Sequence, residues 1–319
     1  MKTFDYPSQG TGSIRAYIWE PQGEVKAIVQ FVHGIAEHSA RYDEYARRLN
    51  EAGILVVSED HMGHGASIGE NGVRGWFAGG WLTAVADTYA LLQRTMAEHP
   101  GLPYILYGHS MGSFLARTIL YRHPDSGIAG AVLSGTAWQP AMILKPGQWV
   151  AKRETRRLGE QQVSPLLTKL MFGSYTKGFD DVRSAFDWLS RDREVVARYE
   201  QDPLCGFDAT AGLARDMLQG IEMIQKKENL AKMKKDLPVL FLAGDRDPVG
   251  ADGKGVKQAL EAFRGCGMTD LTLKLYPDGR HEMHNETNKE EVFCDVIRWI
   301  FDKISGISCK KEGIFPYKY

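Results

Sequence analysis

A serine between two glycines gives this sequence its clearest chemical signal. The stretch Gly108-His109-Ser110-Met111-Gly112 follows the short apolar run 104–107 and precedes residues 113–123, whose apolar positions have helical spacing. The pattern predicts a strand, a sharp turn and a helix, with Ser110 exposed at the turn. Glycines leave room for such a turn. Ser110 is therefore a candidate nucleophile, and the helix would direct its free N–H groups at negative charge formed beside it.

A serine hydroxyl is a weak nucleophile at neutral pH, so it needs a general base and a group that orients that base. Residues 244–247 follow one predicted strand and residues 278–281 follow the next. The carboxyl ends of neighbouring parallel strands meet at one edge of a sheet. We therefore predict that Ser110 is the nucleophile, His281 the general base, and Asp247 the carboxylate that orients His281.

Two alternatives remain open within the same loops. Asp245 could take the place of Asp247, and His284 could take the place of His281. We favour Asp247 because it lies deeper in its loop and is followed by Pro248, which stiffens the backbone.

The same chemistry requires donors for the negatively charged oxygen of a tetrahedral intermediate. The backbone N–H of Met111, directly after the nucleophile, is one candidate. The N–H of Ile35, in the loop after the apolar run 25–32, is the other. We expect Glu37 and His38 to support this loop.

A second group of polar residues has a possible metal-binding pattern. Asp60, His61 and His64 form D-H-x-x-H, and His33 lies in a neighbouring predicted loop. Zinc sites normally have a fuller set of Cys, His and carboxylate ligands. We therefore interpret these residues as a hydrogen-bonded turn, and we predict neither a metal nor a cofactor.

Strand and helix patterns alternate on both sides of an all-helical block. Strands are expected at 13–19, as an antiparallel edge strand, and at 25–32, 54–58, 104–107, 128–133, 238–243 and 271–276. Helices are expected between them, at 42–52, 82–99, 113–123, 254–263 and 288–304. The block contains helical segments at 165–172, 182–200 and 213–228. This order predicts an α/β fold with a mostly parallel central sheet flanked by helices.

The same pattern sets the expected domain organisation. Residues 1–136 and 231–305 would form the two parts of the core, residues 137–230 a helical cap insertion, and residues 306–319 a C-terminal surface tail. Two apolar patches in the cap would pack on the core or line an acyl tunnel: 138–150, with Trp138, Met142, Ile143, Leu144, Trp149 and Val150, and 166–172, with Leu166, Leu167, Leu170, Met171 and Phe172.

Composition excludes several classes of protein. The 39 Lys and Arg residues against 40 Asp and Glu give a formal charge of -1, which provides no field to attract nucleic acid. No run of eighteen apolar residues suggests a membrane span, and the first residues lack a secretory signal. The four cysteines are scattered along the sequence and include no C-x-x-C pair, which favours reduced thiols over a redox or zinc site. Because reduced thiols are typical of the cytoplasm, we expect a cytoplasmic protein.

These motifs resemble the α/β-hydrolase superfamily, and particularly its monoacylglycerol lipase and lysophospholipase branch. The resemblance covers about residues 13–304 and rests on five stretches: 33–39 with Arg41-Tyr42, 60–65, 108–112, 244–247 and 276–281. It implies an oxyanion N–H at Ile35, the acid at Asp247 and the base at His281. It also implies an acyl ester substrate, with monoacylglycerols or lysophospholipids as candidates.

We therefore predict a serine hydrolase that cleaves carboxylic esters of medium-sized apolar acyl groups, with a small-molecule acyl ester, and among these a lipid, as the candidate substrate and no nucleic-acid partner. Peptide or amide cleavage is an alternative, because the same triad performs both reactions. An aminopeptidase would need an acidic anchor for the substrate amine, for which the cap offers Glu154, Glu160, Asp180, Asp181 and Asp187. A non-catalytic binding protein is a further alternative, although the sequence retains every member of the triad.

Overall fold

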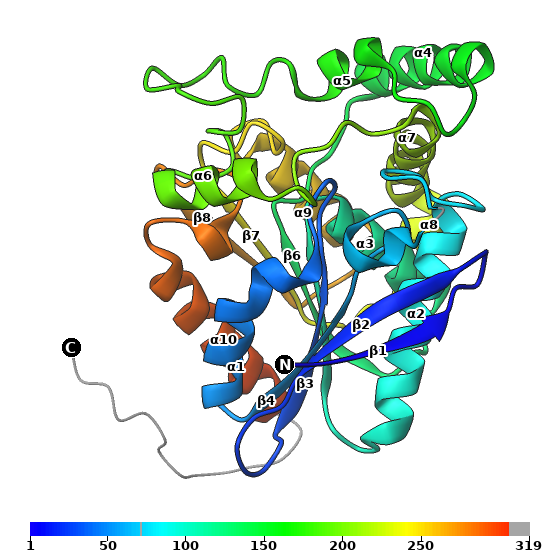
Figure 1. The fold of residues 1–319 in the computed structure, drawn as a ribbon. Helices are drawn as coiled ribbons and strands as arrows, with labels where there is room; N and C mark the ends of the chain where they lie inside the picture. Colours follow the sequence, from blue (N-terminus) through cyan, green and yellow to red (C-terminus); the bar gives the residue numbers. More distant parts are fainter. Residues whose placement is uncertain (71, 306–319) are drawn as a thin grey trace.

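An eight-stranded sheet forms the centre of the molecule (Figure 1). The computed structural model describes residues 1–70 and 72–305, and the predicted tail 306–319 lies outside the described residues. The strand order is β1-β2-β4-β3-β5-β6-β7-β8. The strands are β1 (Lys2–Pro7), β2 (Ser13–Trp19), β3 (Ala27–Val32), β4 (Ile54–Glu59), β5 (Tyr104–His109), β6 (Ile128–Ser134), β7 (Val239–Gly244) and β8 (Leu271–Tyr276).

The sheet is mostly parallel, as predicted. All pairs from β4 through β3, β5, β6 and β7 to β8 are parallel, whereas β1 and β2 are antiparallel to their neighbours. Parallel strands are buried on both faces, which explains why β3, β4, β5 and β7 are almost continuous apolar runs in the sequence.

The predicted position of β2 at the edge of the sheet is wrong. β1 pairs along the whole of β2, from Lys2 opposite Ile18 to Pro7 opposite Ser13, so β1 is the edge strand. Only Phe4 and Tyr6 pack inward from β1. Two apolar positions in a six-residue strand give an alternation too short to recognise in the sequence.

Helices cover both faces of the sheet. One face carries α1 (Asp43–Glu51) and α10 (Lys289–Ser305), and the other carries α2 (Trp81–Glu98), α3 (Met111–Arg122) and α9 (Lys254–Gly265). Stacked aromatic rings join α1 to α10, with the centroids of Tyr45 and Phe293 4.3 Å apart. Three short 3-10 helices in the described chain cover Ser39–Tyr42, Gly65–Ile68 and Met283–Asn285.

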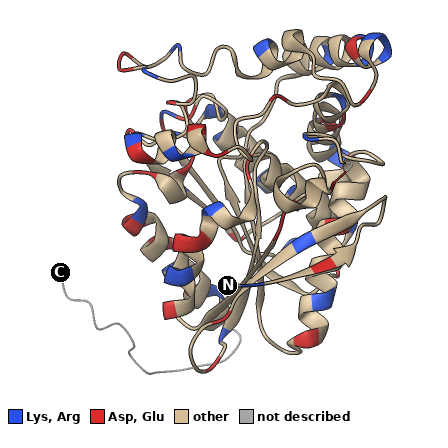
Figure 2. Cartoon of the chain, in the orientation of Figure 1, with Lys and Arg blue, Asp and Glu red and all other residues tan. Residues whose placement is uncertain are grey.

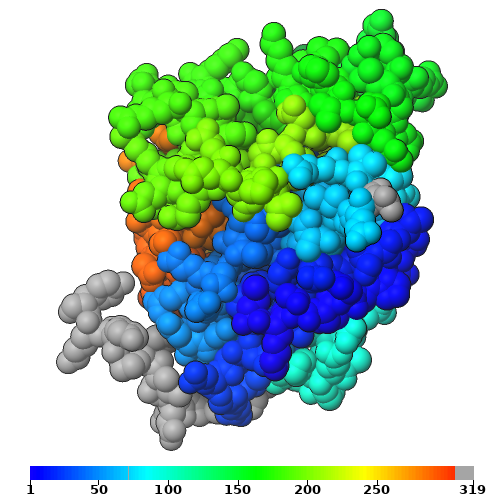
Figure 3. Space-filling view, in the orientation of Figure 1, coloured from blue at the N-terminus to red at the C-terminus, as the bar shows by residue number. Residues whose placement is uncertain are grey.

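Five helices between β6 and β7 form the cap over the carboxyl ends of the strands (Figures 1 and 3). They are α4 (Ala141–Leu158), α5 (Pro165–Phe172), α6 (Arg193–Gln201), α7 (Ala211–Gln225) and α8 (Lys227–Leu230). α7 packs directly on the core. Its Gly220 lies so close to α2 that a Cβ at this position would be only 2.2 Å from Cε2 of Trp81. Lys, Arg, Asp and Glu are interspersed over core and cap (Figure 2), in keeping with the nearly neutral net charge.

The expected helix at 182–200 is wrong over its first half, because α6 begins only at Arg193. The Asp187 carboxylate accepts hydrogen bonds from the backbone N–H groups of Arg183 and Ser184, which fixes a turn in place of a helix. Asp192 then caps α6 by accepting from the N–H of Glu194 at 2.9 Å. The helix expected at 213–228 ends at Gln225, and α8 follows it as a separate short helix.

Candidate active site

Ser110 occupies a strained turn between β5 and α3. Its φ is 52° and its ψ is −123°, a conformation that non-glycine residues rarely adopt. The flanking glycines are required by close backbone contacts: a Cβ at Gly112 would lie 1.9 Å from the Val32 carbonyl oxygen, and one at Gly108 would lie 2.5 Å from the Gly112 carbonyl oxygen. The predicted strand, turn and helix are therefore present, and the turn presents the Ser110 side chain beyond the end of β5.

Asp247 and His281 form a buried pair at the same edge of the sheet. Nδ1 of His281 lies 3.0 Å from each carboxylate oxygen of Asp247. Burial lowers the pKa of His281, but the charge of Asp247 and its hydrogen bond outweigh burial, so this pKa lies above its ordinary value. Nε2 of His281 is buried and has no hydrogen-bond partner among the described residues. The imidazole therefore has one nitrogen oriented by a carboxylate and one available for a proton.

A cavity of about 360 Å³ brings the predicted residues to one place. Ser110 and His281 both line it, together with Gly34, Ile35 and Ala36 of the loop after β3. Gly34 lies close to Ser110, since a Cβ built on Gly34 would be 3.2 Å from Cβ of Ser110. We call residues 33–38 the oxyanion loop from here on.

Buried hydrogen bonds hold the oxyanion loop in shape. The N–H of Gly34 donates to Oε1 of Glu37 at 2.6 Å, and the Tyr199 hydroxyl of the cap donates to the Ala36 carbonyl oxygen at 2.8 Å. Ala36 has a positive φ of 56°. Within the described chain, neither the Ile35 N–H nor the Met111 N–H donates to a protein acceptor. Ile35 also lines the cavity, so its N–H is a candidate donor to a ligand there.

Arg41 also belongs to this site, although the sequence alone indicates no role for it. Its buried guanidinium bonds to Oε2 of Glu37 at 2.6 Å and to both carboxylate oxygens of Glu282 at 2.7 and 2.6 Å. Because Glu282 follows His281 in the chain, Arg41 connects the oxyanion loop to the loop that carries His281. The sequence shows charged residues at Glu37 and Arg41, but only the folded structure shows that Glu282 lies within hydrogen-bonding distance of Arg41.

The cap is hydrogen-bonded to the loop that carries His281. The N–H of His281 donates to the Trp188 carbonyl oxygen at 3.3 Å, and the N–H of Glu282 donates to the Leu189 carbonyl oxygen at 2.7 Å. Arg280 donates to the Asp187 carbonyl oxygen at 2.6 Å. These bonds use the backbone groups that a helix at 182–192 would have consumed, which is the physical reason for the irregular segment there.

The two alternative residues have different environments from the pair. Asp245 accepts a hydrogen bond from the N–H of Asp278 at 2.8 Å and so stabilises a turn. His284 stacks on Tyr42 with ring centroids 4.5 Å apart, and among the described residues neither of its ring nitrogens has a partner. Burial is the main cause that lowers the pKa of His284 to about 3, so this ring is neutral at physiological pH.

The D-H-x-x-H residues form a hydrogen-bonded turn, as interpreted from the sequence. Nε2 of His33 accepts from the N–H of His61 at 3.0 Å, and Nδ1 of His33 lies 2.7 Å from the Gly34 carbonyl oxygen. Asp60 accepts from the N–H groups of Ser39 and Ala66, each at 2.8 Å. Nδ1 of His61 and Nε2 of His64 are buried and have no hydrogen-bond partner among the described residues.

The cap supplies the apolar wall of the cavity. The cavity side chains from this region are mainly aromatic or aliphatic: Pro165, Phe172, Phe186, Trp188, Leu189 and Phe207. Lys169 and Asp208 line the same cavity and are exposed to solvent. The cavity therefore joins an apolar volume under the cap to a polar wall on the core.

The two apolar patches of the cap are each buried in part and exposed in part. Leu144 and Leu167 are buried, and Phe172 lines the cavity. In contrast, Met142 is 88% exposed, and Ile143, Trp149, Leu166 and Leu170 are also exposed. Part of each patch therefore packs inward, and part faces solvent.

Comparison with known proteins identifies the class to which this fold and site belong. Residues 23–288 match the family model described as serine aminopeptidase S33, a hydrolase family. Because the match spans most of the chain, the chain belongs to this α/β-hydrolase family.

Individual relatives narrow the class to ester hydrolases. The chain is 32% identical over 300 residues to the monoacylglycerol lipase of Mycolicibacterium smegmatis, covering 91% of this chain and 94% of the relative. It is 30% identical over 285 residues to human monoglyceride lipase, covering 88% of this chain and 84% of the relative. The predicted resemblance is confirmed, and the chain is a carboxylic ester hydrolase of the monoacylglycerol-lipase-like branch.

Solved structures agree with the fold. A thermostable carboxyl esterase from Bacillus coagulans in complex with glycerol has a TM-score of 0.88 at 30% identity, covering 95% of this chain and 98% of that chain. A soluble variant of the Saccharomyces cerevisiae monoglyceride lipase has a TM-score of 0.76 at 21% identity, covering 95% of each chain, and shares the fold. In the part of the chain that the structure describes, no helix has the length and apolar character to cross a membrane.

Proposed function

We propose that the protein hydrolyses single-chain acyl esters, with monoacylglycerols as the best candidates and lysophospholipids next, through Ser110, His281 and Asp247. The observation that carries this proposal is that Ser110 and His281 line one cavity and that His281 is paired with Asp247 behind it. A nucleophile, an oriented base and an apolar pocket are the parts that acyl transfer requires.

In the first half of the proposed reaction, Oγ of Ser110 attacks the ester carbonyl carbon while Nε2 of His281 takes the hydroxyl proton. The N–H groups of Ile35 and Met111 donate to the resulting oxyanion. The intermediate then collapses, the bond to the alcohol oxygen breaks, and His281 returns the proton to that oxygen. The products are a free alcohol and an acyl ester on Ser110.

In the second half, water replaces the alcohol. His281 takes a proton from the water as it attacks the acyl ester, and the second tetrahedral intermediate uses the same two donors. Its collapse breaks the bond to Oγ of Ser110, which recovers the proton from His281. Asp247 stays ionised throughout, because its role is to hold the imidazole and stabilise its cation.

The apolar cap wall supports an acyl substrate. The aromatic side chains of Phe172, Phe186 and Phe207 offer a surface on which an alkyl chain can be buried, at about 0.8 kcal/mol for each methylene group. The exposed Met142 and Trp149 on α4 further support a substrate presented at a lipid or micelle surface. The names of the lipase relatives agree with both features.

Peptide cleavage remains the second candidate, because the family model is described as an aminopeptidase. The structure does not support the five carboxylates that the sequence suggested as an amine anchor. None of the five cap carboxylates considered for that role lines the cavity. Glu154, Glu160 and Asp181 pair with Arg157, Arg215 and Arg280, respectively.

A panel of soluble substrates tests the proposed function. The panel contains monoacylglycerols and p-nitrophenyl esters with acyl chains from two to eighteen carbons, together with aminoacyl anilides. We expect turnover of the esters with a preference for medium or longer chains over acetate. A faster rate on the anilides than on every ester would contradict ester hydrolysis and favour the peptidase.

A further inference from the structure

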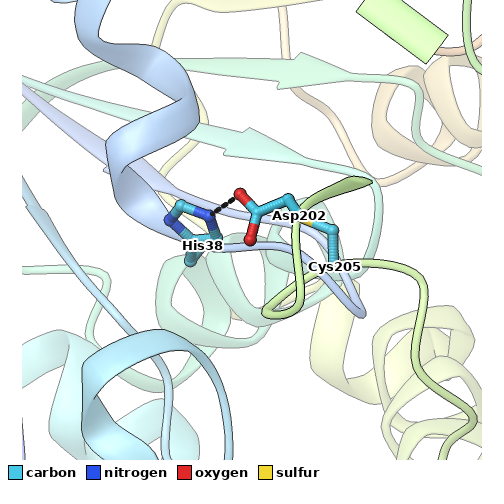
Figure 4. Close-up of side chains that lie close together, drawn as sticks. All are labelled: His38, Asp202 and Cys205. Atoms are coloured by element: carbon cyan, nitrogen blue, oxygen red, sulfur yellow. Dashed lines mark hydrogen bonds and ion pairs between the residues drawn. The ribbon is translucent and has the colours of Figure 1, made fainter. Parts of the chain in front are cut away.

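Three side chains with metal-ligating atoms lie together outside the catalytic residues. They are His38 at the end of the oxyanion loop, and Asp202 and Cys205 in the turn after α6 (Figure 4). One ligand atom of each residue lies within 4.8 Å of those of the other two. Nε2 of His38 already lies 2.8 Å from Oδ2 of Asp202. The cluster therefore joins the core to the cap through side chains close enough to share one ion.

The donor set is suited to a borderline-soft divalent cation. Imidazole nitrogen, carboxylate oxygen and thiolate sulfur are the ligands of protein zinc sites, with bonds of about 2.0–2.3 Å. In the protein as described, a hydrogen bond joins His38 to Asp202. A cation would replace the proton that His38 and Asp202 share in this hydrogen bond. Movements of the three side chains by about an ångström would then bring all three ligand atoms to bonding distance from the ion. Water would fill the fourth tetrahedral position.

The surroundings of the cluster favour positive charge. Glu37 and Glu282 lie nearby, and with Asp202 they give three carboxylates to the single guanidinium of Arg41. A divalent cation bound at this cluster would displace the thiol proton of Cys205 to solvent.

The cluster is also directly connected to the cavity. Gly206 follows Cys205, lines the cavity, and donates its N–H to the Ala36 carbonyl oxygen at 3.0 Å. His38 lies two residues after Ala36 in the same loop. An ion that drew Cys205 and His38 toward one point would displace Ala36 and Gly206, and with them the N–H of Ile35.

We propose that His38, Asp202 and Cys205 bind one Zn²⁺ ion, and that the bound ion inhibits ester hydrolysis by fixing the oxyanion loop to the cap in an unproductive position. The inhibition rests on the proposed function. The binding does not, and it is measured separately.

Binding is tested with Cd²⁺, whose thiolate complexes absorb in the ultraviolet. The protein used is the full chain with Cys266, Cys294 and Cys309 replaced by Ser, so that Cys205 is the single thiol. We expect a charge-transfer band that saturates at one equivalent. Adding Cys205→Ala should abolish it, and His38→Gln should weaken Cd²⁺ binding by about tenfold or more. No band in the single-thiol protein, or an equal band after Cys205→Ala, would overturn the site.

Inhibition is tested with Zn²⁺ and a soluble ester. We expect EDTA-reversible inhibition of the wild-type protein. Cys205→Ala should retain its activity without metal and require roughly tenfold more Zn²⁺ for the same inhibition. Cys294→Ala, which changes an exposed thiol on α10, is the matched control and should behave as wild type. Equal inhibition of Cys205→Ala and wild type would overturn the regulatory role. If no variant hydrolyses any ester, the proposed function fails, while the Cd²⁺ band still decides whether the site binds metal.

Discussion

The core wall and the cap wall of the cavity are built in opposite ways. On the core wall, Ser110, His281 and the oxyanion loop are buried, and charged or backbone hydrogen bonds fix each of them. On the cap wall, Phe172, Phe186 and Phe207 meet the cavity with apolar rings, Tyr199 alone of the described aromatic lining residues donates a side-chain hydrogen bond to the oxyanion loop, and the segment before α6 has no regular structure. From this difference we propose that the core carries out the reaction and that the cap selects the substrate. Substitutions on the two walls should therefore change different kinetic constants.

Removing the orienting carboxylate should have the largest effect on the core wall. We expect Asp247→Asn to lower kcat by on the order of 10⁴-fold, because the amide no longer holds His281 in the required tautomer or stabilises its cation. Asp245→Asn is the control, since Asp245 only accepts from the N–H of Asp278. Steady-state rates on a p-nitrophenyl ester measure both. Similar losses of kcat in the two variants would contradict the assignment of Asp247, and not Asp245, as the carboxylate that orients His281.

Loosening the connection between the loops should have the next largest effect. Arg41→Lys keeps the charge but cannot bond to Glu37 and to both oxygens of Glu282 at once. We expect kcat to fall by about 100-fold through misplacement of the oxyanion loop and His281. Urea unfolding shows separately how much stability is lost. Unchanged kcat in a folded variant would show that Arg41 does not position the site.

The pH profile should report the environment of His281. The proposed base works in its neutral form, and the pKa of His281 is raised by Asp247 against the effect of burial. Activity should therefore rise with pH, and the acid limb of kcat/KM should have its midpoint above about 6.5. The midpoint should fall in Asp247→Asn. A wild-type midpoint well below 6.5 would contradict the paired state of His281.

Changing the cap wall should have the smallest effect on chemistry and a clear effect on selection. Phe172→Ala enlarges the cavity, and we expect the preference among acyl chain lengths to shift by about tenfold while the best kcat stays within a few-fold of wild type. Leu166→Ala, an exposed position on the same helix, is the matched control. If Phe172→Ala lowers kcat on all esters equally, the cap also takes part in the reaction.

The sequence predicted most of the core, because each element there carries its own local signal. The turn at Ser110 needs its glycines, and the buried strands are apolar runs of recognisable length. The candidate residues Ser110, Asp247 and His281 could be predicted to lie together because they follow β5, β7 and β8, parallel strands of one sheet whose carboxyl ends lie at the same edge.

What the sequence could not predict depends on partners far along the chain. Arg41 reaches Glu282 across 241 residues, and nothing in the residues around either one indicates the other. The segment 182–192 has helical spacing, but its carbonyl groups are used by Arg280, His281 and Glu282. The His38 cluster is visible only once α6 is placed against the oxyanion loop.

The most direct test of the account is covalent labelling of the nucleophile. We predict that a fluorophosphonate probe adds one label to the wild-type protein, that peptide mass spectrometry places the label on Ser110, and that Ser110→Ala neither reacts with the probe nor hydrolyses esters although it folds normally. A Ser110→Ala protein that takes up the label or retains ester turnover would contradict the account.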